Sequence, residues 1–423
     1  MKRTLLTLLL CGLTALSASA QKKEQVKTGW NFGPLPAVSY NSDLGFQYGA
    51  LCDIFYFGDG STYPTYLHKF NVELSHYTKG ETIAHMFYDS KYLLPGLRVT
   101  AALSYMDSAM SPFYGFNGYA SPLYESLTKS SSFYYMDRTM LRGIADIQGS
   151  ISDKLTWMAG LTFWNVTTGD VELDKYKGEH SLYEEYRLLG LIDKSEVAGT
   201  HLELKAGLVY DTRDMEAAPT KGYCAEVVAS YSPALFGDAG AYGRIMATWR
   251  QFFPVVGDRL VLGYRVNWQQ TFGDAPFYLQ QTTTPLYLRQ IKNEGLGGKN
   301  SIRGVLQNRI LADGYAWANF EARIKIVNFR FINQNWYVAL NPFVDAGVIT
   351  KDRKLNQMRD SQMADDAIGI IESYHDYDNI HASAGLGLKL VMNHNFIISV
   401  EYGKPFDKRD GKGGLNIGTN YIF

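Results

Sequence analysis

The chain has 423 residues, with 41 Lys and Arg residues against 42 Asp and Glu residues. This balance argues against a nucleic-acid partner, which would favour a basic face on the protein. The 30 Tyr, 22 Phe, 7 Trp and 40 Gly residues are typical of either a secreted β-sandwich or an outer-membrane β-barrel.

Residues 1–20 predict a cleavable signal peptide. Lys2 and Arg3 precede an apolar run from Leu5 to Leu16, and the residues at 18–20 have the small-x-small pattern of a cleavage site. The remaining chain has no second uninterrupted apolar stretch long enough to cross a membrane as a helix. We therefore expect export, with any membrane crossing made by strands.

Residues 21–28 are expected to form a short periplasmic lead, and residues 29–423 an outer-membrane β-barrel. Segments of about ten residues, in which apolar and polar side chains alternate, recur along the second range, as expected of tilted strands that span a bilayer. The apolar face often ends in Tyr or Phe, and the other face is rich in Gly and charge. A soluble sandwich would have a generally polar outer face instead. The pattern predicts an all-β fold, a transmembrane antiparallel β-barrel.

About sixteen strands are predicted, an even number, as in bacterial outer-membrane barrels. They centre near residues 34–41, 46–57, 67–78, 82–93, 97–106, 133–149, 154–167, 200–212, 222–232, 242–254, 259–270, 313–327, 335–348, 381–391, 395–403 and 414–423. Long extracellular loops are expected at 107–132, 168–199, 271–312, 349–380 and 404–413, with short helices within 181–197 and 354–374.

The predicted loops contain no recognisable catalytic or metal-binding motif. His375, Asp376 and Asp378 are crowded in one loop, a spacing that favours a solvated polar cluster over a metal site. No nucleophile–base arrangement is recognisable. We expect no metal, no cofactor and no enzymatic activity.

The segment from Leu296 to Gly304 combines flexible backbone with one permanently charged side chain. Gly297, Gly298 and Gly304 tolerate positive φ without strain. Arg303 offers a rigid guanidinium fork with five donors.

Alternation in the two strands that follow directs two acidic side chains inward. In the predicted strand 313–327, Glu321 lies on the face opposite the apolar side chains. Asp345 does the same in the predicted strand 335–348. A loop arginine folded into the barrel could bind either carboxylate through paired hydrogen bonds. Alternatively, Arg303 lies at an exposed loop tip and both acids line a wet pore. Spacing alone does not distinguish the two.

Three segments resemble motifs of the BamA/TamA family of outer-membrane barrels, also called the bacterial surface antigen superfamily. Ser301-Ile-Arg303-Gly304 is similar to its loop tip, although Val305 stands where an aromatic residue is usual. Phe343-Val-Asp345-Ala-Gly347 resembles the strand that receives the loop arginine. The third segment has Asp211, Arg213 and Asp214, followed by Pro-Thr-Lys-Gly222. The resemblance implies one loop folded into the lumen, with Arg303 bound to Asp345 and Glu321 nearby.

The last strand is expected to carry Ile417, Tyr421 and Phe423 on its lipid face. An aromatic-terminated strand of this kind resembles the signal that assembly machinery reads in new barrels. Pro34 and Pro36 lie at the start of the first strand and donate no backbone hydrogen bond, so its seam with the last strand could be weak. The alternative is a seam that pairs fully from Ala37 onward.

The resemblance implies a place in the cell outer membrane and a role in outer-membrane biogenesis or protein transport. Family members usually carry polypeptide-transport-associated domains ahead of the barrel, whereas only residues 21–28 precede the first strand here. We therefore expect a barrel-only member, in contact with outer-membrane lipid, whose helper domains come from a separate periplasmic or outer-membrane protein. A passive or plugged solute channel and a structural outer-membrane protein are the alternatives.

Overall fold

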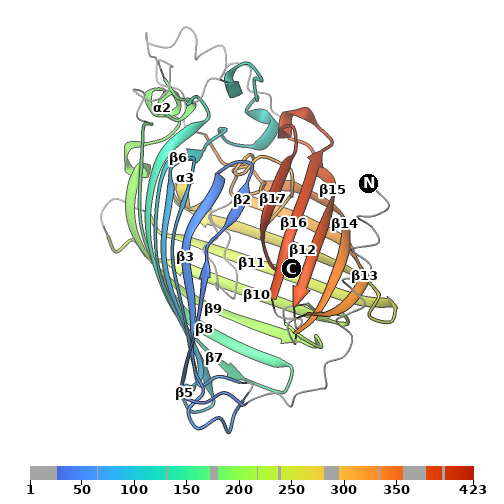
Figure 1. Ribbon diagram of the computed structural model, residues 1–423. Coiled ribbons are helices and arrows are strands. Elements are labelled where there is room, and N and C mark those ends of the chain that lie inside the picture. Colours follow the sequence, from blue (N-terminus) through green and yellow to red (C-terminus); the bar gives the residue numbers. More distant parts are fainter. Residues whose placement is uncertain are drawn as a thin grey trace, which may run out of the picture.

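The strands form one antiparallel sheet that closes on itself (Figure 1). The computed structural model describes residues 26–63, 65–129, 132–171, 180–216, 218–236, 240–280, 295–331, 334–355, 378–392 and 396–423. β1 and β2 both pair with β3 and together make one interrupted strand, so the closed ring has sixteen strand positions. The predicted all-β antiparallel barrel is confirmed, whereas the expected signal peptide lies outside the described residues.

The strands in chain order are β1 (Trp30–Pro36), β2 (Ser39–Asn41), β3 (Gly45–Tyr56), β4 (His68–Tyr77), β5 (Glu81–Leu94), β6 (Leu97–Pro112), β7 (Tyr135–Ser150), β8 (Leu155–Gly169), β9 (Ala198–Asp211), β10 (Gly222–Ser232), β11 (Tyr242–Val256), β12 (Leu260–Gly273), β13 (Gly314–Phe331), β14 (Gln334–Lys351), β15 (His381–Met392), β16 (Phe396–Pro405) and β17 (Gly414–Thr419). The predicted strand at 34–41 begins earlier and is broken at Ala37 and Val38, while the predicted strand at 414–423 ends at Thr419.

Helices in the described ranges are short. They are α2 (Leu182–Leu188), α3 (Phe277–Gln280) and the 3-10 turns η1 (Gly118–Ala120), η2 (Leu127–Lys129), η4 (Lys194–Glu196) and η5 (Lys408–Asp410). None of the described helices has the length and apolar character needed to span a bilayer. α2 and η4 lie within the predicted helical stretch 181–197, whereas most of 354–374 lies outside the described residues.

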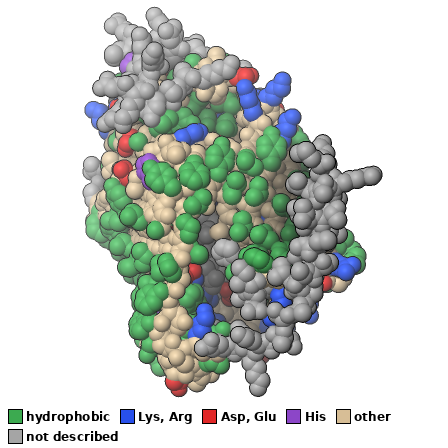
Figure 2. Space-filling model, viewed as in Figure 1, with side chains coloured by type: hydrophobic (Ala, Val, Ile, Leu, Met, Phe, Trp, Pro, Cys, Tyr) green, Lys and Arg blue, Asp and Glu red, His purple; other side chains and the backbone are tan. Residues whose placement is uncertain are grey.

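The barrel wall is apolar outside and polar inside. On β13, Phe320 points outward and is 48% exposed, while Glu321 and Arg323 point inward and are buried. Figure 2 shows hydrophobic side chains covering the visible outer wall. This inside-out arrangement is that of a barrel whose outer face contacts lipid.

The connections at one end of the barrel, which we call the turn end, include the short turns 95–96, 151–154 and 257–259. Outward aromatic rings gather near this end. The rings of Trp30 and Tyr56 lie 4.8 Å apart between centroids, and those of Phe70 and Tyr88 lie 4.9 Å apart. Such a ring belt is typical of the level of lipid headgroups.

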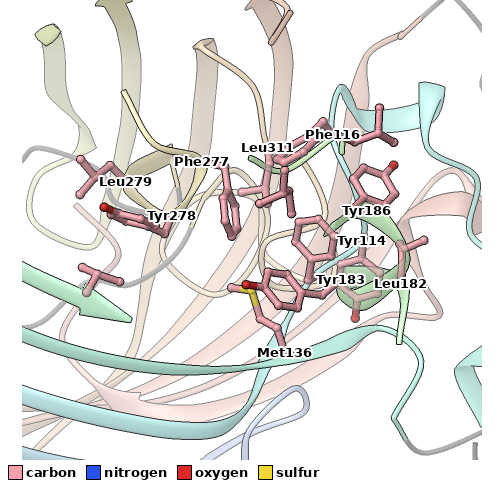
Figure 3. Close-up of a cluster of buried hydrophobic side chains, with 14 of the residues drawn as sticks. Tyr114, Phe116, Met136, Leu182, Tyr183, Tyr186, Phe277, Tyr278, Leu279 and Leu311 are labelled. Carbon is pink, nitrogen blue, oxygen red and sulfur yellow. The ribbon is translucent and has the colours of Figure 1, made fainter. Parts of the chain in front are cut away.

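Long connections lie at the other end, the loop end, and pack against one another. Phe113 meets Tyr183 and Tyr186 edge to face, at 5.8 and 5.4 Å, and Phe277 joins the same cluster (Figure 3). These rings come from three different loops, and each edge-to-face pair contributes about 0.5–1.5 kcal/mol beyond its buried area. The cluster therefore holds the loops together as one layer.

Candidate functional site

The segment 295–312, called the loop segment below, has a small apolar core. Leu296, Ile302, Val305 and Ile310 pack with Tyr315 and Trp317 of β13. Gly297, Gly298 and Gly304 have positive φ angles, of 108°, 94° and 91°. Burial of these apolar side chains fixes the segment against the inner face of the wall.

Backbone groups at the tip of the loop segment bind four successive strands. The carbonyls of Asn300 and Ser301 accept from Arg265 of β12 and Asn319 of β13, at 2.9 and 2.6 Å. The Arg303 amide donates to Asp345 of β14 at 3.0 Å, and the Arg303 carbonyl accepts from Ser383 of β15 at 2.6 Å. The tip is thereby held at each strand from β12 to β15.

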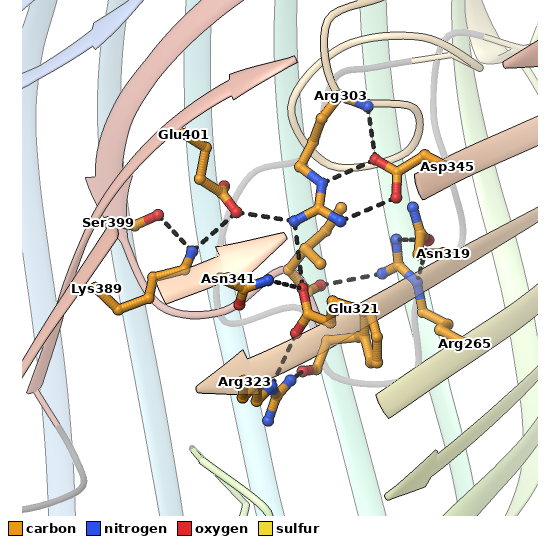
Figure 4. Close-up of polar contacts among 12 residues, drawn as sticks. Arg265, Arg303, Asn319, Glu321, Arg323, Asn341, Asp345, Lys389, Ser399 and Glu401 are labelled. Atoms are coloured by element: carbon orange, nitrogen blue, oxygen red, sulfur yellow. Dashed lines mark hydrogen bonds and ion pairs between the residues drawn. The ribbon is translucent and has the colours of Figure 1, made fainter. Parts of the chain in front are cut away.

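The Arg303 guanidinium is fully buried and binds three carboxylates (Figure 4). Its Nε and Nη2 donate to the two oxygens of Asp345, at 2.8 and 2.9 Å. Its Nη1 donates to Glu321 at 3.3 Å and to Glu401 of β16 at 2.8 Å. The ring of Phe343 lies beneath it, 3.5 Å from centroid to guanidinium carbon. The structure thus brings together Arg303, Asp345, Glu321 and Phe343, and an exposed loop tip is excluded.

Two further cations balance these acids. Lys389 lies 2.9 Å from Glu401, and Arg323 lies 2.8 Å from Glu321. The six side chains, Arg303, Arg323, Lys389, Glu321, Asp345 and Glu401, form what we call the Arg303 cluster. Glu401 and Lys389 were not anticipated from sequence, although the alternation in the predicted strands 395–403 and 381–391 directs both inward.

Glycine allows the backbone of the loop segment to touch β16. A Cβ atom at Gly304 would lie 2.3 Å from the carbonyl carbon of Gly403, and one at Gly403 would lie 2.4 Å from the Arg303 oxygen. Neither position has room for a side chain. A side chain at Gly347, the last residue of the Phe343 motif, would clash with Ile302 and Leu296.

Two arginines join the Arg303 cluster to the chain terminus. Arg323 Nη2 donates to the carbonyl of Phe423 at 2.6 Å, and its Nη1 donates to the carbonyl of Pro219 at 3.2 Å. Arg265 donates to the carbonyl of Ile422 at 3.1 Å. The last residues therefore lie inside the barrel.

The expectation that Tyr421 and Phe423 face lipid is wrong. β17 ends at Thr419, and Asn420 adopts a left-handed conformation with φ of 71°. Tyr421 and Phe423 are then buried, with the Arg323 guanidinium 4.0 Å from the Tyr421 ring. Hydrogen bonds and cation–π contacts from inward arginines offset the loss of strand pairing.

The seam between the first and last strands is short. β17 pairs with β2 at Ile417↔Tyr40 and Asn416↔Asn41, whereas β17 pairs with β16 along its whole length. β1 pairs with β3 alone among the described strands, and the Ala37 amide donates to Gly49 of β3. A seam that pairs fully from Ala37 onward is excluded. Figure 1 shows β2 and β17 side by side.

The third family-like segment forms the turn between β9 and β10. Arg213 binds Asp211 through Nε and Nη2, at 2.9 and 2.7 Å, and Gly222 opens β10 with φ of 93°. Asp214 accepts from the amides of Thr220 and Lys221, at 2.9 and 3.3 Å. Burial alone would raise the pKa of Asp214, but the hydrogen bond from the Thr220 hydroxyl, together with those from the two amides, holds it below its ordinary value.

This turn does not contact Arg303 directly. It reaches the Arg303 cluster through the Pro219 carbonyl, which binds Arg323.

No group of side chains with metal-ligand geometry occurs in the described part of the chain. Asp378 instead accepts from His381 at 2.9 Å. His375 and Asp376 lie outside the described residues.

The model of the Omp85 superfamily domain matches residues 68–423. No curated protein matches the sequence. Among solved structures, the chain is similar to BamA from Haemophilus ducreyi lacking POTRA domains 1–3, with a TM-score of 0.57 and 16% identity over 93% of this chain and 71% of that chain. It is also similar to CdiB from Acinetobacter baumannii, with a TM-score of 0.49 and 14% identity over 96% of this chain and 64% of that chain. The first of these shows a shared barrel fold.

Proposed function

The chain belongs to the Omp85 superfamily, and on this premise we propose that it is an outer-membrane barrel that inserts or exports polypeptides through an opening between β2 and β17. The loop end then faces the cell exterior and the turn end faces the periplasm. A separate periplasmic or outer-membrane protein delivers the polypeptide to the turn end.

The observation that carries this proposal is the short seam. Only Tyr40 and Asn41 of β2 pair with β17. Beyond them, the Ser42 amide donates to the Leu415 carbonyl at 3.2 Å, and the Ser42 hydroxyl bonds the carbonyl and the amide of Leu415 at 3.0 and 2.6 Å. Each backbone hydrogen bond contributes about 0.5–1.5 kcal/mol net. Separation of this seam therefore costs on the order of 2–4 kcal/mol in backbone bonds, much less than an ordinary strand pair of this barrel.

The Arg303 cluster supports the same proposal by stiffening the wall beside the seam. The loop segment binds β12 to β15 through its backbone, and Arg303 adds β16 through Glu401. The described bonds from Ser301 and Arg303 to the wall go to β13, β14, β15 and β16, and none of them goes to β17. The seam between β17 and β2 therefore lies just outside the part of the wall that these two residues brace.

A photo-crosslinking residue placed at the seam tests this function in living cells. We expect a probe at Ile417 to capture polypeptides on their way to the outer membrane or cell surface. A probe at Val227, which is outward-facing on the fully paired strand β10, is the control and should capture none. Equal capture at both positions, or none at Ile417, would contradict the proposal.

A solute channel is the competing function, favoured by the polar inner wall and by a ring of sixteen strands, which is wide enough for a pore. The loop segment occupies part of that inner face, and a channel would have to conduct around it. The conductance of the purified protein in a planar bilayer separates the two functions.

A further inference from the structure

The outer wall at the loop end of β16 carries lysines beside exposed aromatic rings. Tyr402, Lys404 and Phe406 follow one another on the outward face, and Phe406 is 70% exposed. Lys408 is exposed in the adjoining turn. Figure 2 shows Lys and Arg side chains gathered at this end of the wall, directly beyond the apolar surface.

The two lysines lack acidic partners among the described residues. Arg409 in the same turn binds Asp407 at 2.8 Å, and Lys412 binds Glu125. No described carboxylate lies within ion-pair distance of Lys404 or Lys408. Their positive charges are therefore available to a ligand.

Small neighbours leave the Lys404 ammonium open along the wall. Ala384 is its cross-strand partner on β15, and Gly413 lies on its other side. The outward neighbours of Tyr402 are Leu386 and Leu415, which are 49% and 36% exposed. A headgroup could approach Lys404 between the two aromatic rings while its acyl chains covered the leucines.

We infer that this surface, made by Tyr402, Lys404, Phe406 and Lys408, binds a lipid that carries a phosphate monoester on its headgroup, in the outer leaflet. A monoester carries about −1.5 to −2 charges at pH 7, which two unpaired ammonium groups match better than the single charge of a phosphodiester. Free phosphate would use neither the exposed aromatic rings nor the leucines. Because β16 adjoins β17, the bound lipid would lie beside the seam.

The inference rests on the proposed outer-membrane location but is independent of seam opening. Full-length protein in detergent micelles is titrated with bis-phosphorylated lipid A, and bound lipid is counted by native mass spectrometry. The Lys404→Gln/Lys408→Gln variant should bind lipid A roughly tenfold more weakly or worse, since each lysine near an anionic surface adds appreciable attraction. Lys404→Arg should retain binding.

The matched control is Lys91→Gln/Lys154→Gln, which removes two exposed lysines at the turn end. Its affinity for lipid A should equal that of the original chain. Equal binding by the Lys404/Lys408 double variant would overturn the inference. So would equal binding of phosphatidylglycerol or of lipid A stripped of phosphate, or complete competition by inorganic phosphate at the lipid's concentration. A barrel that fails to open its seam in cells would leave these binding results unchanged.

Discussion

Arg323 and Phe423 are joined by a hydrogen bond of 2.6 Å, from Nη2 to the carbonyl of the last residue. The same guanidinium donates through Nε to Glu321 at 2.8 Å, and Glu321 also accepts from Arg303. The loop tip and the chain terminus therefore share one carboxylate. A substitution of Arg303 or of Arg323 therefore changes the charge that surrounds Glu321, and with it the electrostatic environment of the other arginine.

Release of the terminus is the first prediction. Arg265→Met with Arg323→Met removes both donors to the last two carbonyls, and hydrogen bonds to charged groups contribute about 1.5–3 kcal/mol each. We expect carboxypeptidase to trim the folded variant at least tenfold faster. Arg250→Met is the control, because Arg250 binds Glu226 at 3.1 Å and forms no hydrogen bond with the described terminal residues. If the double variant fails to fold, Arg265→Met alone serves. An unchanged trimming rate in a folded variant would show that these arginines do not retain the terminus.

Loss of the loop arginine should destabilise the barrel. Arg303→Ala leaves Asp345, Glu321 and Glu401 with an uncompensated buried charge, at a cost of about 3–5 kcal/mol. The temperature at which the folded barrel shifts to its unfolded gel mobility should fall clearly. Lys412→Ala, which breaks an exposed pair, should change stability by less than about 1 kcal/mol. Unchanged transitions in both Arg303→Ala and Asp345→Ala would remove any stabilising role for this pair.

Conductance should depend on the loop segment. Purified protein in a planar bilayer is expected to show small, erratic currents, because residues at the tip contact the inner wall at β12 to β16. Deletion of Gly297 to Val305 should enlarge the current, whereas Lys412→Ala, a change on the outer surface, should not. A large and steady current from the intact protein would support the channel function instead.

The turn between β9 and β10 should be sensitive to acid. Because the pKa of Asp214 is lowered in the folded state, its contribution is present above the ordinary value of 3.8 and is lost as the pH falls through the folded-state pKa. Asp214→Asn should therefore lower thermal stability slightly at pH 7, by on the order of 0.5–1 kcal/mol, since the side chain is exposed. The two proteins should converge once the pH falls below the folded-state pKa of Asp214, where its carboxyl is protonated. A difference that persists there would assign the effect to something other than the charge.

Sequence alternation was sufficient for the wall and for part of the site. Because side chains alternate between the two faces of a strand, the sequence predicted that Glu321 and Asp345 point inward. The same alternation in the predicted strand 395–403 would have added Glu401 to the inward-facing acids. Sequence could not place the terminus, because alternation continues through Tyr421 and Phe423 without a break. The turn at Asn420 depends on Arg265 and Arg323, which are distant in the chain and whose contacts with it arise only in the closed barrel.

A disulfide across the seam tests whether the insertion or export of polypeptides requires β2 and β17 to separate. Ser39→Cys and Gly418→Cys lie one position beyond the paired residues Tyr40 and Ile417, and a side chain at Gly418 meets nothing within 4 Å. The free thiols Cys52 and Cys224 are first replaced by serine.

The control disulfide joins Ala206 and Ala229, an outward pair on the fully paired strands β9 and β10. We expect oxidation of the seam to stop outer-membrane assembly and cell growth, a reductant to restore both, and the control disulfide to have no effect. Normal assembly and growth with a fully oxidised seam would contradict the proposed opening.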